Sequence, residues 1–358
     1  MKAAVCYTYG EPLVIEDVVI DPPQVGEVKV RVAATAICHS DIHLIKGEFG
    51  GTVPVVAGHE AAGVVEEVGA GVTLTKPGDR VVVSLLRSCG RCYSCTMGAP
   101  NNCEAQWVLD QNSRLHNQQG QALRHGTRVG AFAEYCIVDQ SQVVPISDDI
   151  AYDKASLLAC GVITGVGAVI NTAQVRPGNS VVVIGCGGVG LNAVQGAALA
   201  GAYPIIAVDV LDTKLDSARS FGATHTVNST QENLRDVTRS LTNKRGADYV
   251  FVTVGSPKAL EQSFALLSKA GAVVIVGLAG SVPLTLPVSM LIWNESRILT
   301  SWMGSARLRV DVPRLVTMYR EGRLKLDELI TAHYPLEQIN DAIAALEQGH
   351  SLRNVIIF

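Results

Sequence analysis

Several features are scarce in this chain of 358 residues, and each absence excludes a class of protein. Charged residues make up only 17% of the chain and hydrophobic residues 48%, a balance that argues against intrinsic disorder. No long run of lysine or arginine occurs and the formal net charge is −4, so we expect neither nucleic acid nor a membrane surface as a partner. Glycines and charges interrupt every apolar stretch before it could span a bilayer. Residues 1–7 lack the apolar region of a signal peptide.

Cysteine is not scarce, but its distribution differs from that of a disulfide framework. The nine cysteines are an odd number, and most are clustered rather than spread as pairs. In a long chain without an export signal, this distribution favours a reducing cytoplasm and metal ligation over disulfides. Cys6, Cys136 and Cys186 lie outside the clusters and receive no role.

The length predicts two domains, because a single hydrophobic core stops growing at about 250–300 residues. In the first part, residues 27–32 alternate charged and apolar side chains, and residues 63–69 and 79–83 are apolar runs bounded by glycine or aspartate. Such punctuation predicts a compact, barrel-like β domain. The stretch 110–126, rich in Gln, Asn and Arg, is predicted to be a surface loop.

The pattern changes near Ala155 to strands that alternate with segments of helical length. This alternation predicts βαβ units, a parallel sheet and an α/β fold class. A doubly wound dinucleotide-binding domain would have six strands, predicted at residues 181–185, 204–210, 224–228, 248–255, 272–277 and 297–302. Three further elements are expected: an amphipathic helix at 312–321, a helix opening at 336–341, and a strand at 354–358 that rejoins the first domain.

A glycine-rich turn, Gly185-Cys186-Gly187-Gly188-Val189-Gly190, follows the first of these strands. A lone Gly-x-Gly-x-x-Gly is a weak signal, but this one follows four apolar β-formers and precedes a predicted helix. Gly185 permits the tight turn, Gly187 lets backbone approach a pyrophosphate, and Gly190 allows close helix–strand packing. The N–H groups of the helix start would bind the phosphates. Asp209 ends the next strand, where an acidic side chain binds the ribose 2′-hydroxyl of NAD, although it could also be a turn residue.

Four cysteines gather within fifteen residues, namely Cys89, Cys92, Cys95 and Cys103. Thiolates this close can all point at one tetrahedral ion, and Zn²⁺ bound by four sulfurs is the usual structural site. Free thiols and an iron–sulfur cluster are the alternatives. The ferredoxin run ends in a three-residue gap followed by proline, whereas the last gap here is seven residues and Glu104 follows.

A second set of donors is separate from this lobe, in Cys38-His39-Ser40-Asp41 and Gly58-His59-Glu60. A cysteine and a histidine are ligands that suit a catalytic zinc with an open position. Metal-bound histidines usually donate their second N–H to a carboxylate, and Asp41 and Glu60 are available for this. A histidine alone would more often be an ordinary structural residue. Together with the dinucleotide turn, these donors point to zinc-dependent hydride transfer.

The chain resembles zinc-containing medium-chain alcohol dehydrogenases over essentially its whole length. The resemblance is carried by residues 58–63, the four-cysteine lobe, residues 160–165 and the glycine-rich turn. It implies a GroES-like, β-rich catalytic domain at 1–160 and 303–358, and a Rossmann NAD-binding domain at 161–302.

The resemblance also implies two zinc sites. Cys38, His59 and Cys160 would bind the catalytic zinc, with Asp41 holding His59 and Glu60 able to approach the metal. The structural zinc would take the four lobe cysteines. Without the resemblance, Cys160 could equally be part of an apolar core.

For the cofactor, the resemblance implies NAD-binding positions beyond the turn. Lys214 resembles the family's ribose-contacting lysine and Arg353 its second pyrophosphate arginine, with Gly277 and Leu278 also at the cofactor. His39 departs from the family, since many members have arginine there, and a histidine offers a less certain charge to the pyrophosphate.

The implied reaction is the reversible oxidation of a primary or secondary alcohol to an aldehyde or ketone by NAD, in a cytoplasmic homodimer or homotetramer. Zinc would stabilise the alkoxide as a Lewis acid, and Ser40 would relay the proton to the cofactor ribose and on to His43. Two alternatives remain: a nicotinoprotein with tightly bound NAD, and a non-catalytic NAD-binding protein. The presence of Cys38, His59 and Ser40 argues against the second.

Overall fold

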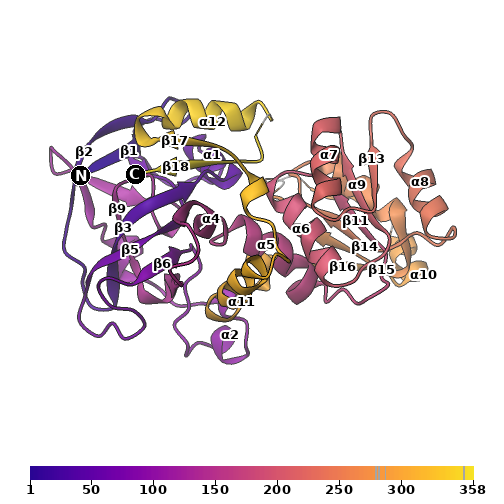
Figure 1. The fold of residues 1–358 in the computed structure, drawn as a ribbon, viewed down its shortest axis with the longest axis horizontal. Helices are drawn as coiled ribbons and strands as arrows, with labels where there is room; N and C mark the ends of the chain where they lie inside the picture. Colours follow the sequence, from indigo (N-terminus) through magenta and orange to yellow (C-terminus); the bar gives the residue numbers. More distant parts are fainter. Residues whose placement is uncertain (279, 281–282, 287, 350) are drawn as a thin grey trace. The chain divides into compact units, whose positions relative to one another are not determined.

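The computed structural model describes residues 1–278, 280, 283–286, 288–349 and 351–358. The chain forms two compact units (Figure 1). Unit 1 comprises Met1–Gly161 and Arg307–Phe358, and unit 2 comprises Val162–Ala306. The boundaries expected from the sequence, after residues 160 and 302, lie one and four residues before those observed. Unit 2 is therefore one continuous segment inserted into unit 1.

Unit 1 is built from two β-structures. A closed barrel contains β1 (Lys2–Cys6), β2 (Val14–Ile20), β7 (Leu115–Asn117), β8 (Ala122–His125) and β4 (Val55–Val56). A larger sheet has the order β10 (Val143–Pro145), β6 (Arg80–Val83), β5 (Glu60–Val68), β3 (Glu27–Ala36), β18 (Arg353–Ile357) and β17 (Ile330–Pro335), and β9 (Tyr135–Asp139) also pairs with β3. Its helices are α1 (His39–Ile45), α2 (Tyr93–Thr96), α3 (Val108–Gln111), α4 (Tyr152–Leu157), α11 (Leu308–Arg320) and α12 (Ile339–Glu347).

The strand predicted at 354–358 does rejoin the first domain. It is β18, which pairs antiparallel with β3 and places Val355 opposite Ala36. Val355 and Ile356 are completely buried, so apolar burial holds this late segment in the sheet.

The prediction of a surface loop at 110–126 is wrong. This stretch contains the hairpin β7–β8, in which Leu115 faces Leu123 and both side chains are completely buried. Arg114 is also buried and donates two hydrogen bonds to the carboxylate of Glu27, at 3.0 and 2.8 Å. Polar residues can enter a core when their hydrogen bonds are satisfied, which is why polarity alone misled the prediction.

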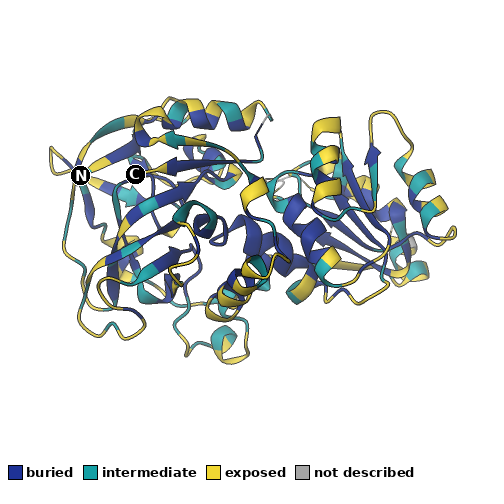
Figure 2. Ribbon diagram, viewed as in Figure 1, coloured by how far each residue is buried: buried dark blue, intermediate teal, exposed yellow. Residues whose placement is uncertain are grey.

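Unit 2 contains a parallel sheet of six strands, as predicted. The order is β13 (His225–Asn228), β12 (Ile205–Asp209), β11 (Val181–Ile184), β14 (Ala247–Val252), β15 (Leu267–Ile275) and β16 (Arg297–Thr300), the doubly wound order 3-2-1-4-5-6. Its helices are α5 (Gly161–Gly167), which begins at the unit boundary, α6 (Gly188–Leu199), α7 (Asp212–Ser220), α8 (Leu234–Leu241), α9 (Pro257–Ser263) and α10 (Val288–Asn294). Figure 2 shows the central strands as buried, which fits their continuous runs of valine and isoleucine.

In the described part of the chain, no helix is both long enough and apolar enough to cross a membrane.

Candidate metal and cofactor sites

Unit 1 brings the predicted catalytic zinc ligands together. Cys38 caps the start of α1, His59 and Glu60 lie at the start of β5, and Cys160 follows α4. All four side chains are buried, and their ligand atoms lie within 4.8 Å of one another. Residues from three separate segments of unit 1 thus converge on one point.

Asp41 holds this arrangement in place. Its Oδ2 accepts a hydrogen bond from the backbone N–H of Cys38 at 3.2 Å, and its Oδ1 accepts from that of Gly58 at 3.0 Å. The same Oδ1 lies 2.8 Å from His59 Nδ1, so His59 Nδ1 donates its hydrogen to the carboxylate. Gly58 has φ +92°, and a Cβ there would lie 2.7 Å from the backbone nitrogen of Phe132. Position 58, next to the predicted metal ligand His59, therefore requires glycine.

The donor set fits a zinc ion. Because Nδ1 of His59 is committed to Asp41, Nε2 keeps its lone pair, and this buried nitrogen has no hydrogen-bond partner among the described residues. Cys160 donates to Cys38, which holds the pKa of Cys38 well below its usual range and raises the pKa of Cys160. Two sulfurs and one imidazole nitrogen are ligands that zinc prefers.

Glu60 and Arg353 form a buried pair beside these ligands. Nη1 of Arg353 lies 3.3 Å from Oε1 of Glu60, and both side chains are almost fully buried. Burial raises the pKa of Glu60 to about 8, although Arg353 opposes the shift. A Cβ at position 161 would lie 1.7 Å from Nη2 of Arg353, so Gly161 makes room for the guanidinium. The sequence led us to expect Arg353 at the pyrophosphate, and no pattern indicated its pairing with Glu60.

Helix α1 carries the predicted proton-transfer residues. Ser40 Oγ lies 3.7 Å from Cys38 Sγ, and His43 follows one turn later. His43 Nδ1 lies 2.5 Å from Oε2 of Glu48, a residue that the sequence analysis did not single out. His39, the departure from the family pattern, is exposed at the start of this helix.

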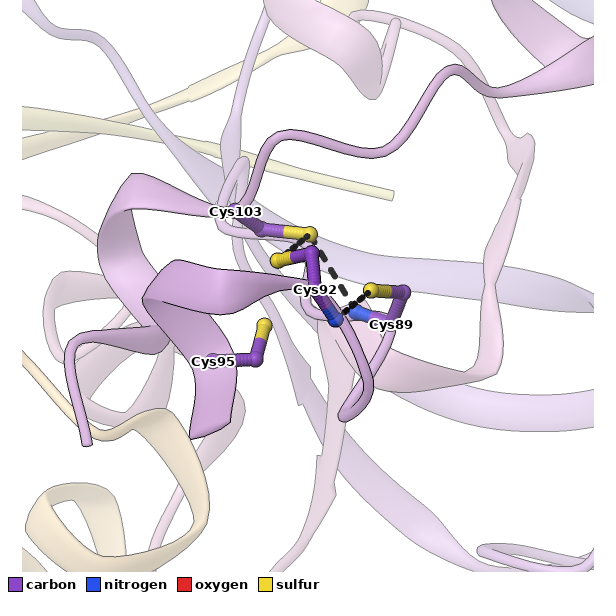
Figure 3. Close-up of side chains that lie close together, drawn as sticks. All are labelled: Cys89, Cys92, Cys95 and Cys103. Atoms are coloured by element: carbon purple, nitrogen blue, oxygen red, sulfur yellow. Dashed lines mark hydrogen bonds between the residues drawn. The ribbon is translucent and has the colours of Figure 1, made fainter. Parts of the chain in front are cut away.

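The four lobe cysteines also converge, on α2 and the turns around it (Figure 3). Their sulfurs lie within 4.8 Å of one another. The backbone N–H of Cys89 donates to Cys103 Sγ at 3.3 Å, and that of Cys92 donates to Cys89 Sγ at 3.3 Å. Backbone N–H donors, from Glu104 foremost, lower the pKa of Cys92 to about 6. Burial raises the pKa of Cys95 to about 12, so the hydrogen bonds favour thiolates in part of the lobe only, and it is the convergence of four sulfurs that fits a metal site.

Unit 2 forms the glycine-rich turn between β11 and α6. Gly185 has φ +96°, and a Cβ at Gly190 would lie 1.7 Å from the carbonyl oxygen of Gly185, so both positions require glycine. A Cβ at Gly187 would meet no atom within 4 Å, which leaves open space beside the backbone. Gly188 and Val189 begin α6, whose first N–H groups suit a phosphate.

The Asp209 carboxylate accepts three backbone hydrogen bonds, one of them from this turn. Oδ2 accepts from the N–H of Cys186 at 2.7 Å, and Oδ1 accepts from those of Val210 at 2.8 Å and Leu211 at 3.1 Å. The aspartate thus occupies the end of the strand next to the turn, where a ribose-binding carboxylate belongs. Asp209 also stabilises the turn, so its interpretation as a ribose-binding acid and its interpretation as a turn residue are compatible.

The remaining predicted cofactor residues lie in the same unit. Lys214 lies in the first turn of α7, shortly after Asp209 in the sequence, and it is half-buried. Gly277 follows β15, and a Cβ there would lie 2.7 Å from the backbone of Thr253 and Val254. Leu278 is exposed.

Comparison with known proteins agrees with this arrangement. The family described as "Alcohol dehydrogenase GroES-like domain" matches residues 24–148, and the family "Zinc-binding dehydrogenase" matches residues 188–320. The NDMA-dependent alcohol dehydrogenase of Amycolatopsis methanolica is 39% identical over 372 residues, covering 99% of this chain and 98% of that protein.

Two solved structures are similar over the whole chain. One is an alcohol dehydrogenase zinc-binding domain protein from Burkholderia ambifaria, with TM-score 0.95 and 34% identity, covering 100% of this chain and 98% of that one. The other is benzyl alcohol dehydrogenase from Acinetobacter calcoaceticus, with TM-score 0.93 and 31% identity, covering 100% and 99%. These matches confirm the GroES-like and Rossmann fold class and the alcohol dehydrogenase activity predicted from the sequence. The chain belongs to the zinc-containing medium-chain alcohol dehydrogenase family.

Proposed function

We propose that this NAD-dependent alcohol dehydrogenase oxidises primary or secondary alcohols at a zinc held by Cys38, His59 and Cys160. The observation that carries the proposal is the buried, unpartnered Nε2 of His59, which faces two cysteine sulfurs in the described part of unit 1. A buried imidazole nitrogen without a partner is costly unless it binds something. A zinc ion accounts for it.

When bound, the zinc would supply Lewis acidity toward the alcohol oxygen and the nicotinamide would accept the hydride. The residues of the chain hold and move the proton. Ser40 lies beside Cys38 and His43 lies three residues later, on the same face of α1. Ser40 would accept the alcohol's proton on its oxygen as its own hydroxyl proton leaves for His43, and His43 would then release a proton to water. The Glu60 carboxylate, beside the same ligands, would approach the metal when ligands exchange.

A second zinc would occupy the four-cysteine lobe. Four sulfurs converge, and backbone N–H groups donate to those of Cys89, Cys92 and Cys103, which supports a site with no open position. Its role would be structural, because thiolate ligation contributes to the free energy of folding.

NAD would bind to unit 2 at the glycine-rich turn. Asp209 would accept a hydrogen bond from the ribose, and Lys214 would contact the ribose beside it. The residue that follows Asp209 is Val210, so this position offers no cation that would attract a 2′-phosphate. Gly277 and Leu278 would line the cofactor from the end of β15. His39, exposed on α1, stays a candidate for binding the pyrophosphate, whereas Arg353 is buried against Glu60.

The substrate would be a small alcohol with an apolar substituent. Leu85 is buried and follows Ser84, whose hydroxyl donates to the carbonyl oxygen of Ala159. Phe49 is exposed next to His43. Trp107 is half-buried, with the Arg87 guanidinium 5.6 Å from its ring centre. The similarity to a benzyl alcohol dehydrogenase supports an aromatic primary alcohol as one candidate.

The protein would form homodimers, which is also the first step toward a homotetramer. In the described part of the unit 2 sheet, β16 is one of the two edge strands, and β13 is the other. The N–H of Ser301 donates to Ile275 of β15. Backbone groups alternate in direction along a strand, so those of Ile298 and Thr300 point away from β15, toward the open edge of the sheet. A copy related by a two-fold axis could pair Ile298 with Thr300 of its partner.

The exposed apolar side chains of α10 also suit an interface. They are Val288, Ile292 and Trp293, the last of which is 80% exposed.

A nicotinoprotein with tightly bound NAD is the second candidate, because the Amycolatopsis relative is described as NDMA-dependent. Denaturing the purified protein and measuring released NAD separates the two. A cytoplasmic location is part of the proposal, since an odd number of cysteines, most of them clustered, suits metal ligation in a reducing compartment.

Zinc analysis together with an NAD-linked screen of alcohols tests the whole proposal. We expect two zinc ions per chain and NAD reduction with at least one apolar alcohol. Purified protein with a single zinc, or zinc that stays in a His59→Ala variant at both sites, would contradict the assignment.

A further inference from the structure

His43 has a carboxylate partner, Glu48, which lies just after the end of α1. Its Nδ1 lies 2.5 Å from Oε2 of Glu48. An ionised carboxylate only accepts hydrogen bonds, so Nδ1 carries the hydrogen and donates it. The hydrogen bond at one ring nitrogen decides which tautomer is present. Nε2 of His43 therefore keeps its lone pair.

The backbone places Glu48 at this position. The N–H of Glu48 donates to the carbonyl oxygen of His43 itself at 2.9 Å, so the chain turns back over the end of α1. Gly47 makes this turn with φ +78°, and a Cβ there would lie 2.9 Å from the ring of Tyr9. The turn is thus fixed by a backbone bond and by a neighbouring aromatic ring, and the carboxylate is held where it meets the imidazole.

The other charged groups near α1 have partners of their own. Asp41, on the same helix, is committed to His59 and to backbone N–H groups. Lys46, at the helix end, pairs with Glu347 of α12. Arg124 of β8 donates to the carbonyl oxygen of Thr52.

Two further groups lie near α1. Arg128 lies on the short helix η2 (Gly126–Arg128), which packs against α1. Phe49 stands against the ring, with the two ring centres 5.6 Å apart. Of the carboxylates named around α1, Glu48 is the one that hydrogen-bonds to His43.

A simple stabilising ion pair is the competing explanation. The side chain of His43 is 34% exposed and that of Glu48 is 53% exposed. Exposed ion pairs contribute little to stability, because solvent screens them and ordering two side chains has an entropic cost. Stability alone therefore gives little reason for so specific a placement.

We propose that Glu48 is a positioning residue for proton release during alcohol oxidation. This inference rests on the proposed function, in which His43 passes the proton to water. Glu48 holds His43 with Nδ1 protonated and Nε2 free. In the transfer, the O–H bond of the donating hydroxyl breaks and an N–H bond forms at Nε2. The resulting imidazolium then loses the Nε2 proton to water, and the neutral ring returns to the same tautomer.

The test compares the parent enzyme with Glu48→Gln, His43→Gln and the double variant, in the hydride step of alcohol oxidation between pH 6 and pH 10. Glutamine keeps the size of the side chain but can turn an N–H toward the ring, so it no longer enforces one tautomer. Glu347→Gln is the matched control, because it removes the neighbouring ion pair at the end of α1 without touching His43. Glu48→Asp tests rescue by a shorter carboxylate.

We expect Glu48→Gln to slow the step about tenfold near neutral pH, a fraction of the roughly 10²–10⁴-fold that a positioned base supplies. The loss should fade at high pH, where hydroxide collects the proton, and added imidazole should reduce it. The KM for NAD and the Tm should stay at the parent values, as in Glu347→Gln. In the His43→Gln background, Glu48→Gln should have no further effect.

Other results would overturn the inference. If Glu48→Gln follows the parent's pH profile, or slows the reaction equally in the His43→Gln background, Glu48 does not act through His43. A parent enzyme that reduces no NAD with any alcohol would instead refute the proposed function, so the two failures are distinguishable.

Discussion

Replacing Asp209 by asparagine should change which cofactor the enzyme prefers. The carboxylate accepts from Cys186 on one oxygen and from Val210 and Leu211 on the other. Asparagine has one oxygen and one NH₂ group, so either orientation turns a donor toward a backbone N–H. The ribose would also lose a charged acceptor.

The size of the effect follows from these bonds. A hydrogen bond to a charged group contributes about 1.5–3 kcal/mol, and 1.4 kcal/mol corresponds to a factor of about ten. We therefore expect kcat/KM for NAD⁺ to fall by about 10- to 150-fold. The efficiency with NADP⁺ should fall less or rise, because the charge that repels its 2′-phosphate is gone.

The assay measures kcat/KM for both cofactors at one ionic strength. Asp212→Asn is the control, since it removes the same charge three residues away, where the carboxylate accepts from Asn228. Equal changes in the Asp209 and Asp212 variants would show a general charge effect and refute the reasoning. Comparable efficiencies with NAD⁺ and NADP⁺ in the parent enzyme would refute it directly.

Three further predictions concern the metal sites, the proton path and the core of unit 1. Cys95→Ser should mainly lower Tm, whereas Cys38→Ser should abolish turnover and leave Tm nearly unchanged; equal shifts of Tm in the two variants would contradict the two roles. Ser40→Ala should lose alcohol oxidation at every pH, and recovery at high pH would exclude it from the proton path. Arg114→Met should lower the free energy of unfolding in urea by about 3–5 kcal/mol by leaving Glu27 buried and unpaired. Adding Glu27→Gln should restore much of that loss, and a double variant no more stable than the single one would refute the argument.

The sequence was most informative where local pattern and structure coincide. The run Val181–Ile184 is apolar and β-branched, ends at a glycine and proved to be the central strand β11. The spacing of the lobe cysteines likewise reflects one short loop, in which all four sulfurs converge. In both cases the sequence signal lies within fifteen residues, although the partners of β11 in the sheet are the distant strands β12 and β14.

The sequence was least informative where the partners are distant or polar. The hairpin β7–β8 was missed because its apolar residues, Leu115 and Leu123, are single positions within a polar stretch. The pairing of Glu60 with Arg353 depends on β18 joining β3, and no local pattern encodes the distance between two side chains. A charged residue in a core is understandable only when its partner is known.

The insertion of unit 2 into unit 1 has a consequence for the nascent chain. Ribosomes add roughly 5–20 residues per second, so the stretch between Cys160 and Arg353 takes roughly 10–40 s to synthesise. During that interval unit 2, a continuous segment, can fold as it emerges, while unit 1 waits for β18. The edge of β3 that β18 will cover is open to pairing with another chain, and Glu60 has no guanidinium beside it. Unit 2 is thus able to fold first, and unit 1 passes through a stage in which its sheet is incomplete.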